Sequence, residues 1–407
     1  MVLKFCLYSI FKNLRFFERF FIIYLLAPAS LGGAGLSFFR IGVLTGYQKL
    51  LTALLEVPTG FLADRRGRRL SLTVCFASYV AAFPLYALSA GREGALQLVV
   101  LAAAQTFFAV GEAFRTGTNK AIMLDWVDRT RPPGGATRLV GVTRFWSKVA
   151  AGVSALAGGL LLWRTASFAP LFWLAVLPAA AGVVLVRTYP AWLEGEYSRE
   201  RGAATRLPWR TRLAALWAVP GIVLLFVQSV LFESQIKLAQ HYLQPFLEFG
   251  LARRDVAVVG GIGAVLIGLY YLVQDGLGGI SSRLAPRTEG LAGGGKRASA
   301  AIHATAATVV FGVAGSLLEN WILAGILGFL VLAILQNLRR PIFVSRFNEV
   351  MDKPQRAATL SVESQARSLA FAILAPATGW VADAHGLAGV FLVLGVLLAD
   401  AALLGRR

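Results

Sequence analysis

Apolar stretches of about 20 residues recur along almost the whole chain, and short polar connections separate them. A helix needs about 20 mainly apolar residues to cross the hydrocarbon core of a bilayer. The pattern therefore predicts an all-α polytopic membrane protein with twelve transmembrane helices. The predicted spans lie near residues 16–35, 41–62, 70–90, 96–117, 139–162, 167–187, 214–238, 256–278, 298–317, 320–338, 362–382 and 387–404.

Lysines and arginines gather in every second connection between these spans. No Lys or Arg occurs from Ala298 to Leu338, or from Ser368 to Gly405, although both ranges contain a predicted external connection. Basic residues stay on the cytoplasmic side of a membrane. The alternation therefore predicts a multi-pass protein of the inner or plasma membrane with both termini in the cytoplasm.

One polar stretch between spans, residues 189–213, is much longer than the others. It divides the spans into six and six. The sequence thus predicts an N-terminal six-helix bundle at residues 1–188, a cytoplasmic linker at 189–213, and a C-terminal six-helix bundle at 214–407.

The composition agrees with a membrane protein and removes several other classes. Hydrophobic residues make up 57% of the chain and charged residues only 15%, whereas soluble proteins carry about 25% charged residues. The net charge of +19 is spread over many connections and forms no single patch, so nucleic acid is not an expected partner. Cys6 and Cys75 lie in apolar runs, and the three histidines lack metal-ligand spacing, so neither a metal nor a cofactor is expected.

One glycine-rich segment resembles a nucleotide-binding loop but lacks its chemistry. GLAGGGKR at 290–297 matches the first part of a phosphate loop, which requires Ser or Thr after its lysine to bind Mg²⁺. Arg297 stands at that position. An ATP-driven protein is therefore not expected.

The segment GFLADRRGRR at 60–69 places four arginines and one aspartate between two apolar spans. A weaker copy, GGISSRLAPR at 278–287, follows the second span of the other half. An internal repeat of this kind is typical of transporters whose substrate site lies between the repeats.

These residues resemble the major facilitator superfamily of transporters. EVPTGFLADRRGRR (56–69) matches the superfamily signature G-x-L-a-D-r-x-G-r-r between spans two and three. Residues 111–127 and 356–386 resemble a bacterial drug-exporter-like branch. The span-four antiporter motif of the superfamily has an arginine where this chain has Phe107, and the span-five motif keeps only its last pair, Gly158–Gly159.

The resemblance implies that the turn at 60–69 is a conformational latch, formed by Gly60, Asp64, Arg65, Gly67 and Arg69. Gly60 would permit close helix approach, and Gly67 would permit the tight turn. Asp64 would face a helix N-terminus, which the resemblance places near 359–361 at the start of span eleven. Arg65 and Arg69 would pair with Asp64 or with acidic helix ends. A simple positive-inside anchor is the alternative.

Polar residues inside predicted spans are the candidates for substrate or proton binding, because they are expensive in a bilayer. They are Lys49, Gln105, Gln228, Glu233 and Glu56. Interhelical hydrogen bonds or snorkelling side chains are the alternative explanation. Glu56 could instead gate against Arg144 or Lys148, or form a salt bridge at a helix end.

The expected function is secondary active transport of a small organic molecule by alternating access. Export is the first expectation, with proton antiport as its energy source, and uptake of a metabolite by symport or uniport is the alternative. A transporter-shaped receptor and an intramembrane transferase are further alternatives, and the second lacks the acidic motif that its chemistry requires. The protein is not expected to be an enzyme. A monomer surrounded by membrane lipid is expected.

Overall fold

The computed structural model describes residues 1–132, 135–194, 222–350 and 353–404. Every element in these ranges is a helix, so the all-α class is confirmed. Most of the predicted linker, residues 195–213, lies outside the described residues. The main helices are α1 (Val2–Asn13), α2 (Phe21–Leu26), α3 (Phe38–Arg66), α4 (Arg68–Ser89), α5 (Ala95–Arg115), α6 (Thr118–Thr130), α7 (Gly135–Thr165), α8 (Ala169–Arg187), α11 (Ile222–His241), α12 (Leu243–Ala252), α13 (Gly263–Leu291), α14 (Gly295–Leu318), α15 (Ile322–Val350) and α16 (Lys353–Leu404).

Short 3₁₀ helices fill some of the connections, at Glu18–Phe20, Ala29–Leu31 and Ala191–Glu194. The long α16 is two helices in series, because Gly386 between them has a φ of 71°. Its two parts correspond to the predicted spans at 362–382 and 387–404.

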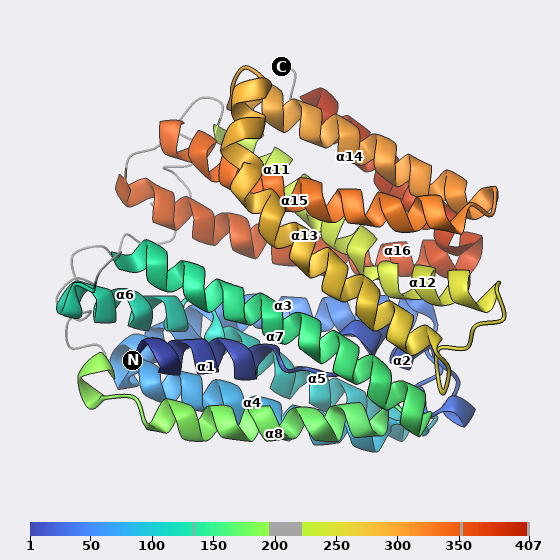
Figure 1. Cartoon of the computed structure of the whole chain (residues 1–407), viewed down its shortest axis with the longest axis horizontal. Coiled ribbons are helices and arrows are strands. Elements are labelled where there is room, and N and C mark those ends of the chain that lie inside the picture. The colour runs from blue at the N-terminus through green and yellow to red at the C-terminus, as the bar shows by residue number, and fades with distance from the viewer. Residues whose placement is uncertain (133–134, 195–221, 351–352, 405–407) are drawn as a thin grey trace. The chain divides into compact units, whose positions relative to one another are not determined.

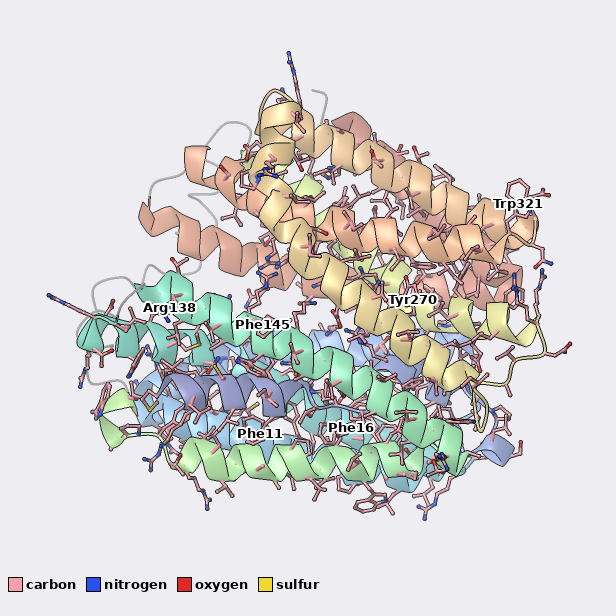
Figure 2. The ribbon with its side chains drawn as sticks, viewed as in Figure 1. Phe11, Phe16, Arg138, Phe145, Tyr270 and Trp321 are labelled. Atoms are coloured by element: carbon pink, nitrogen blue, oxygen red, sulfur yellow. The ribbon has the colours of Figure 1, made fainter. Side chains whose placement is uncertain are left out.

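Eight helical stretches within the described residues are long and apolar enough to cross a membrane. Large apolar side chains also face outward, such as Ile373 at 73% exposure and Leu177 at 66%. Exposed apolar surface on this scale is unfavourable in water but suits contact with lipid chains. Trp321, which is 69% exposed, lies at the end of a helix where α14 is followed by α15 (Figure 2), a position typical of interfacial aromatic residues. The chain is therefore a multi-pass membrane protein, and the number twelve stays a prediction.

The start of the chain differs from the prediction of a first span near 16–35. Helix α1 begins at Val2, the chain leaves helical geometry at Leu14 with a ψ of 62°, and α2 resumes at Phe21. The predicted span begins at residue 16, directly after Arg15, because hydropathy treats a charge as the flank of an apolar segment. Arg15 is instead paired with a carboxylate inside the protein, so its charge does not end the apolar segment.

Contacts between Cα atoms divide the chain into two compact units. Unit 1 contains Met1–Leu36, Tyr47–Ala204 and Leu251–Asp275, and unit 2 contains the remaining residues. In unit 1, α4 packs against α5 and α8, and α1 packs against α7 and α8 (Figure 1). In unit 2, α16 packs against α11 and α14, and α14 packs against α15.

Aromatic side chains dominate the core of unit 1. Tyr24, Tyr79, Phe83, Tyr86 and Phe172 are all at most 2% exposed. Tyr79 and Phe83 stack with ring centroids 5.7 Å apart, and Tyr24 meets Phe172 edge to face at 4.9 Å. Aromatic pairs of this geometry add to the packing energy of helices that lack a hydrophobic driving force in lipid.

In unit 2, the beginning of α3 is held against α16 by a carboxylate. The backbone N–H groups of Phe38 and Phe39 donate to the two oxygens of Asp383, each at 2.9 Å. A Cβ on Gly42 would lie only 2.3 Å from the carbonyl oxygen of Ala375, so glycine permits the close approach of the two helices. Asp383 thus caps α3 from the side of another helix.

Candidate substrate site

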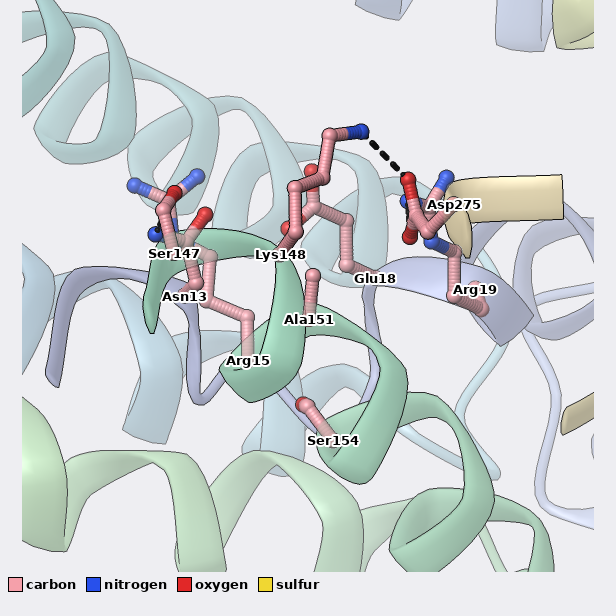
Figure 3. Close-up of a pocket in the computed structure, with 9 residues that line it drawn as sticks. All are labelled: Asn13, Arg15, Glu18, Arg19, Ser147, Lys148, Ala151, Ser154 and Asp275. Carbon is pink, nitrogen blue, oxygen red and sulfur yellow. Dashed lines mark hydrogen bonds and ion pairs between the residues drawn. The ribbon is translucent and has the colours of Figure 1, made fainter. Parts of the chain in front are cut away.

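A polar cavity of about 230 Å³ lies within unit 1 (Figure 3). Three segments line it: the interrupted part of the first helical segment, the middle of α7, and α13. The lining residues are Asn13, Arg15, Glu18, Arg19, Ser147, Lys148, Ala151, Ser154 and Asp275. Ser147 to Ser154 lie near the middle of α7, and Asp275 lies near the middle of α13. If these helices span the bilayer, the cavity lies near its midplane, where transporters bind their substrates.

The interruption between α1 and α2 is accommodated by a glycine of α7. A Cβ on Gly158 would lie 2.2 Å from the carbonyl oxygen of Phe16, so only glycine fits without a shift of the backbone. The neighbouring Gly159 faces Ala264 in the same way, with 2.4 Å to its carbonyl oxygen. The glycine pair of span five therefore allows two segments that carry cavity residues to approach α7 closely.

Asp275 holds two cations of the cavity at once. Lys148 Nζ donates to one carboxylate oxygen at 2.6 Å, and Arg19 Nη2 donates to the other at 2.9 Å. Figure 3 shows Lys148 reaching from α7 toward Asp275. The Arg19 guanidinium also lies over the Tyr271 ring, 4.5 Å from its centre. The arrangement links the first segment, α7 and α13 through one carboxylate.

A second charged cluster adjoins the cavity through Arg15. Arg15 Nη2 donates to Glu112 at 2.7 Å, and the Tyr79 hydroxyl donates to the same carboxylate at 2.6 Å. Arg115 pairs with the other oxygen of Glu112. The Arg15 guanidinium stacks over the rings of Tyr79 and Phe108, 4.6 and 4.9 Å from their centres. These contacts hold two arginines around one carboxylate in the protein interior.

Two buried polar atoms of the cavity have no hydrogen-bond partner among the described residues. They are Arg15 Nε and Ser154 Oγ. Ser154 is only 2% exposed. A buried polar atom without a partner costs about 1–3 kcal/mol, so such atoms require a reason. Both atoms belong to residues that line the cavity.

Lys49 and Glu56, two of the sequence candidates, lie beside this charged cluster. Lys49 interacts electrostatically with Glu112 and Arg115, and Glu56 interacts with Lys49 and Arg115. Gln105 is buried at 3% exposure on α5, and no hydrogen bond connects it to the cavity residues. A binding role for these three residues stays a prediction.

The other two sequence candidates, Gln228 and Glu233, lie in unit 2 on α11. Gln228 is buried at 4% exposure. Glu233 accepts a hydrogen bond from Gln336 at 3.2 Å and lies 3.7 Å from Arg367 and 3.9 Å from Lys237. Arg367 also pairs with Glu363 at 3.3 Å, so α11, α15 and α16 share one buried polar network. The two sets of candidates therefore belong to separate clusters, one in each unit.

The backbone of the predicted latch turn requires glycine at one position, Gly67. Gly67 alone separates α3 from α4 and has a φ of 102°. Within the described residues, a Cβ on Gly60 would meet no heavy atom within 4 Å, so close helix approach does not explain glycine there in this conformation. The side chains of Asp64 and of residues 359–361 lie outside the described ones, and the latch role stays a prediction.

The arginines of this turn contact several neighbours. Arg65 lies over the Phe61 ring at 4.1 Å, and Arg69 donates to the carbonyl oxygen of Tyr189 at 3.0 Å. Arg68, which the sequence analysis did not select, pairs with Asp125.

The sequence analysis missed Arg15, Arg19 and Asp275 as site residues, and it considered Lys148 as a gating partner of Glu56. The rule that selected Lys49 would also have selected Asp275, a carboxylate alone in the apolar run LIGLYYLVQDGLGGI. Arg15 and Arg19 gave no comparable signal, because they lie close to other charges at the start of the chain.

Comparison of the whole chain with solved structures identifies the fold. A POT family transporter in complex with a thioalcohol-conjugated peptide superposes with a TM-score of 0.69 and 17% identity, over 99% of this chain and 94% of that chain. A D-xylose-proton symporter gives a TM-score of 0.73 at 14% identity, over 100% and 96% of the two chains. The nucleoside transporter NupG gives 0.68 at 14% identity, over 100% and 95%. No protein-family model matches the sequence, and no curated protein matches it.

The chain therefore shares the fold of these transporters. These structures are transporters and not enzymes. Identities below 20% show the shared fold and do not show the drug-exporter-like branch.

Proposed function

We propose that this protein is a secondary active transporter that moves a small organic molecule across the cytoplasmic membrane by alternating access. The charged cavity at the middle of α7 and α13 carries this proposal, because a cavity at mid-depth in a transporter fold is where a substrate binds. Its volume of about 230 Å³ is below the roughly 300–1,000 Å³ of pockets for drug-sized ligands, so it suits a smaller molecule or the polar group of a larger one.

In this proposal the two six-helix bundles, at residues 1–188 and 214–407, rock about the site while the linker at 189–213 joins them. Both termini lie in the cytoplasm, and the protein acts as a monomer in lipid. The turn with Gly60, Asp64, Arg65, Gly67 and Arg69 works as a latch in one of the two states.

Two directions of transport are proposed, each supported by a different observation. Export by proton antiport is supported by the resemblance of residues 111–127 and 356–386 to drug exporters. Proton-coupled uptake is supported by the structural likeness to a D-xylose-proton symporter. Intramembrane carboxylates such as Asp275, Glu112 and Glu233 would carry the proton in either case.

Purified protein in liposomes tests the proposal and separates the two directions. A labelled compound is added outside, and the lumen is made acidic or alkaline relative to the exterior. Antiport predicts accumulation only with an acidic lumen, and symport predicts it only with an acidic exterior. Equal uptake with either gradient, or uptake equal to that of empty liposomes, would contradict proton-coupled transport.

A further inference from the structure

The charged groups that line the cavity carry a net positive charge. Its lining contains three cations (Arg15, Arg19 and Lys148) and two carboxylates (Glu18 and Asp275). Asp275 is 10% exposed, whereas Lys148 is 39% exposed. Lys148 therefore extends from an accessible position toward a buried carboxylate and can change its partner without leaving the cavity.

The unmet groups of the cavity are hydrogen-bond donors or can act as donors. Arg15 Nε–H has no acceptor among the described residues, and the Ser154 hydroxyl has no partner there. The Lys148 ammonium has three N–H groups, and one of them donates to Asp275. These donors need acceptor oxygens beyond those that Glu18 and Asp275 supply, and a carboxylate or a phosphate provides several.

We propose that the cavity binds the anionic group, a carboxylate or a phosphate, of the transported molecule, and that Asp275 holds Lys148 and Arg19 while the site is empty. This inference rests on the proposed transport function and adds the chemical class of its substrate. On binding, the substrate's oxygens replace those of Asp275 on Lys148, and they accept from Ser154 and from Arg15 Nε.

A cationic or a neutral molecule fits the same cavity less well. A cation would enter a lining of three cations and two carboxylates, and both oxygens of one carboxylate, Asp275, already accept at 2.6 and 2.9 Å. A neutral molecule could accept from Ser154, but it could not compensate the charge of Lys148 when Asp275 releases it. An anion provides acceptors for the unmet donors and also offsets the net positive charge of the lining.

Binding of matched compounds by the purified full chain tests the charge preference. Three sets share a skeleton and differ in charge: benzoate, benzamide and benzylamine; butyrate, butyramide and butylamine; gluconate, glucose and glucosamine. Inorganic phosphate is added as the phosphate probe. Isothermal titration and thermal unfolding in detergent should show binding of at least one anion and weaker binding of its neutral and cationic partners. Binding of no anion, or tighter binding of the amines, would overturn the proposal.

Variants of the cavity test the geometry. Lys148→Gln should weaken binding of the anion by about 10- to 100-fold, because it removes a charge-assisted hydrogen bond. Asp275→Asn should tighten it by about tenfold or more, because the competing carboxylate is gone. Lys296→Gln, at the exposed start of α14, is the matched control and should leave binding unchanged. If Asp275→Asn unfolds at the wild-type temperature but binds the anion more weakly, the proposed exchange of Lys148 from Asp275 to the substrate is overturned. If that variant does not fold, Lys148→Gln beside its control decides.

A lipid headgroup could present the same phosphate chemistry. A thermal shift produced by phosphatidylglycerol in the micelles, but by none of the soluble anions, would assign the cavity to lipid and overturn the substrate class. The inference and the proposed function fail separately. Transport of an amine through liposomes would support the transport function and contradict the anionic substrate. Binding of the anion without any flux would support the anionic ligand and contradict the transport function.

Discussion

Replacing Gly158 by alanine should destabilise the protein, although alanine is the better helix former. The new Cβ would lie 2.2 Å from the carbonyl oxygen of Phe16 and 3.3 Å from the Phe20 ring. The first contact is with backbone, so α7 or the interrupted segment must move. Overpacking of this kind costs about 1–3 kcal/mol, while the helix gains at most about 1 kcal/mol. Because the closest contact is with backbone, the upper end of that cost applies, and the expected net loss in the free energy of unfolding is about 2 kcal/mol.

Gly141 on the same helix provides the matched control. A Cβ at that position meets no atom within 4 Å, so Gly141→Ala should raise the free energy of unfolding by about 0.5–1 kcal/mol. Unfolding of both variants in detergent micelles, followed by tryptophan fluorescence, shows whether each substitution lowers or raises the free energy of unfolding. Equal stability of the two variants would refute the close packing of α7 against the interruption that carries Arg15.

The remaining predictions concern single polar groups. Ser154→Ala should leave stability equal or slightly higher, because the hydroxyl has no partner in the described structure, yet it should weaken anion binding by about fivefold or more. The Ser316 hydroxyl donates to the carbonyl oxygen of Val313 at 2.7 Å, so Ser316→Ala should change stability and leave anion binding unchanged. The same effect of both substitutions on anion binding would contradict a binding role for Ser154. Asp383→Asn should weaken the cap of α3 by about 0.5–1 kcal/mol. It should also shift the conformational equilibrium several-fold, as measured by distances between spin labels. An unchanged distribution of these distances would argue against the cap. Asp64→Asn should also shift this equilibrium and slow transport without unfolding the protein, and an unchanged transport rate would count against the latch.

Most of the helices could be predicted from the sequence, because bilayer spans leave a strong hydropathy signal. The predicted range 70–90 became α4 at Arg68–Ser89, and 167–187 became α8 at Ala169–Arg187. The first span failed because hydropathy counts Arg15 and Arg19 as exposed charges. In the structure both are paired, with Glu112 and Asp275, from segments far away in the chain.

The candidate site could be predicted only in part for the same reason. A lone polar residue in an apolar span can be recognised, and Lys49 and Glu233 were selected in this way, but neither lines the cavity and their binding role stays a prediction. The sequence does not show which charges meet, so the pairing of Lys148 with Asp275, 127 residues apart, had no signal. The glycine pair at 158–159 was recognised as part of a motif, but its contacts with Phe16 and Ala264 depend on the folded backbone.

Flux through proteoliposomes is the measurement that tests the central proposal most directly. The anion that binds best in solution is labelled and offered to vesicles that carry a pH gradient of either sign. Transport through the charged cavity predicts saturable, gradient-dependent flux that Lys148→Gln lowers by about tenfold or more and that Lys296→Gln leaves unchanged. Folded protein that moves none of the compounds under either gradient would contradict a transport function.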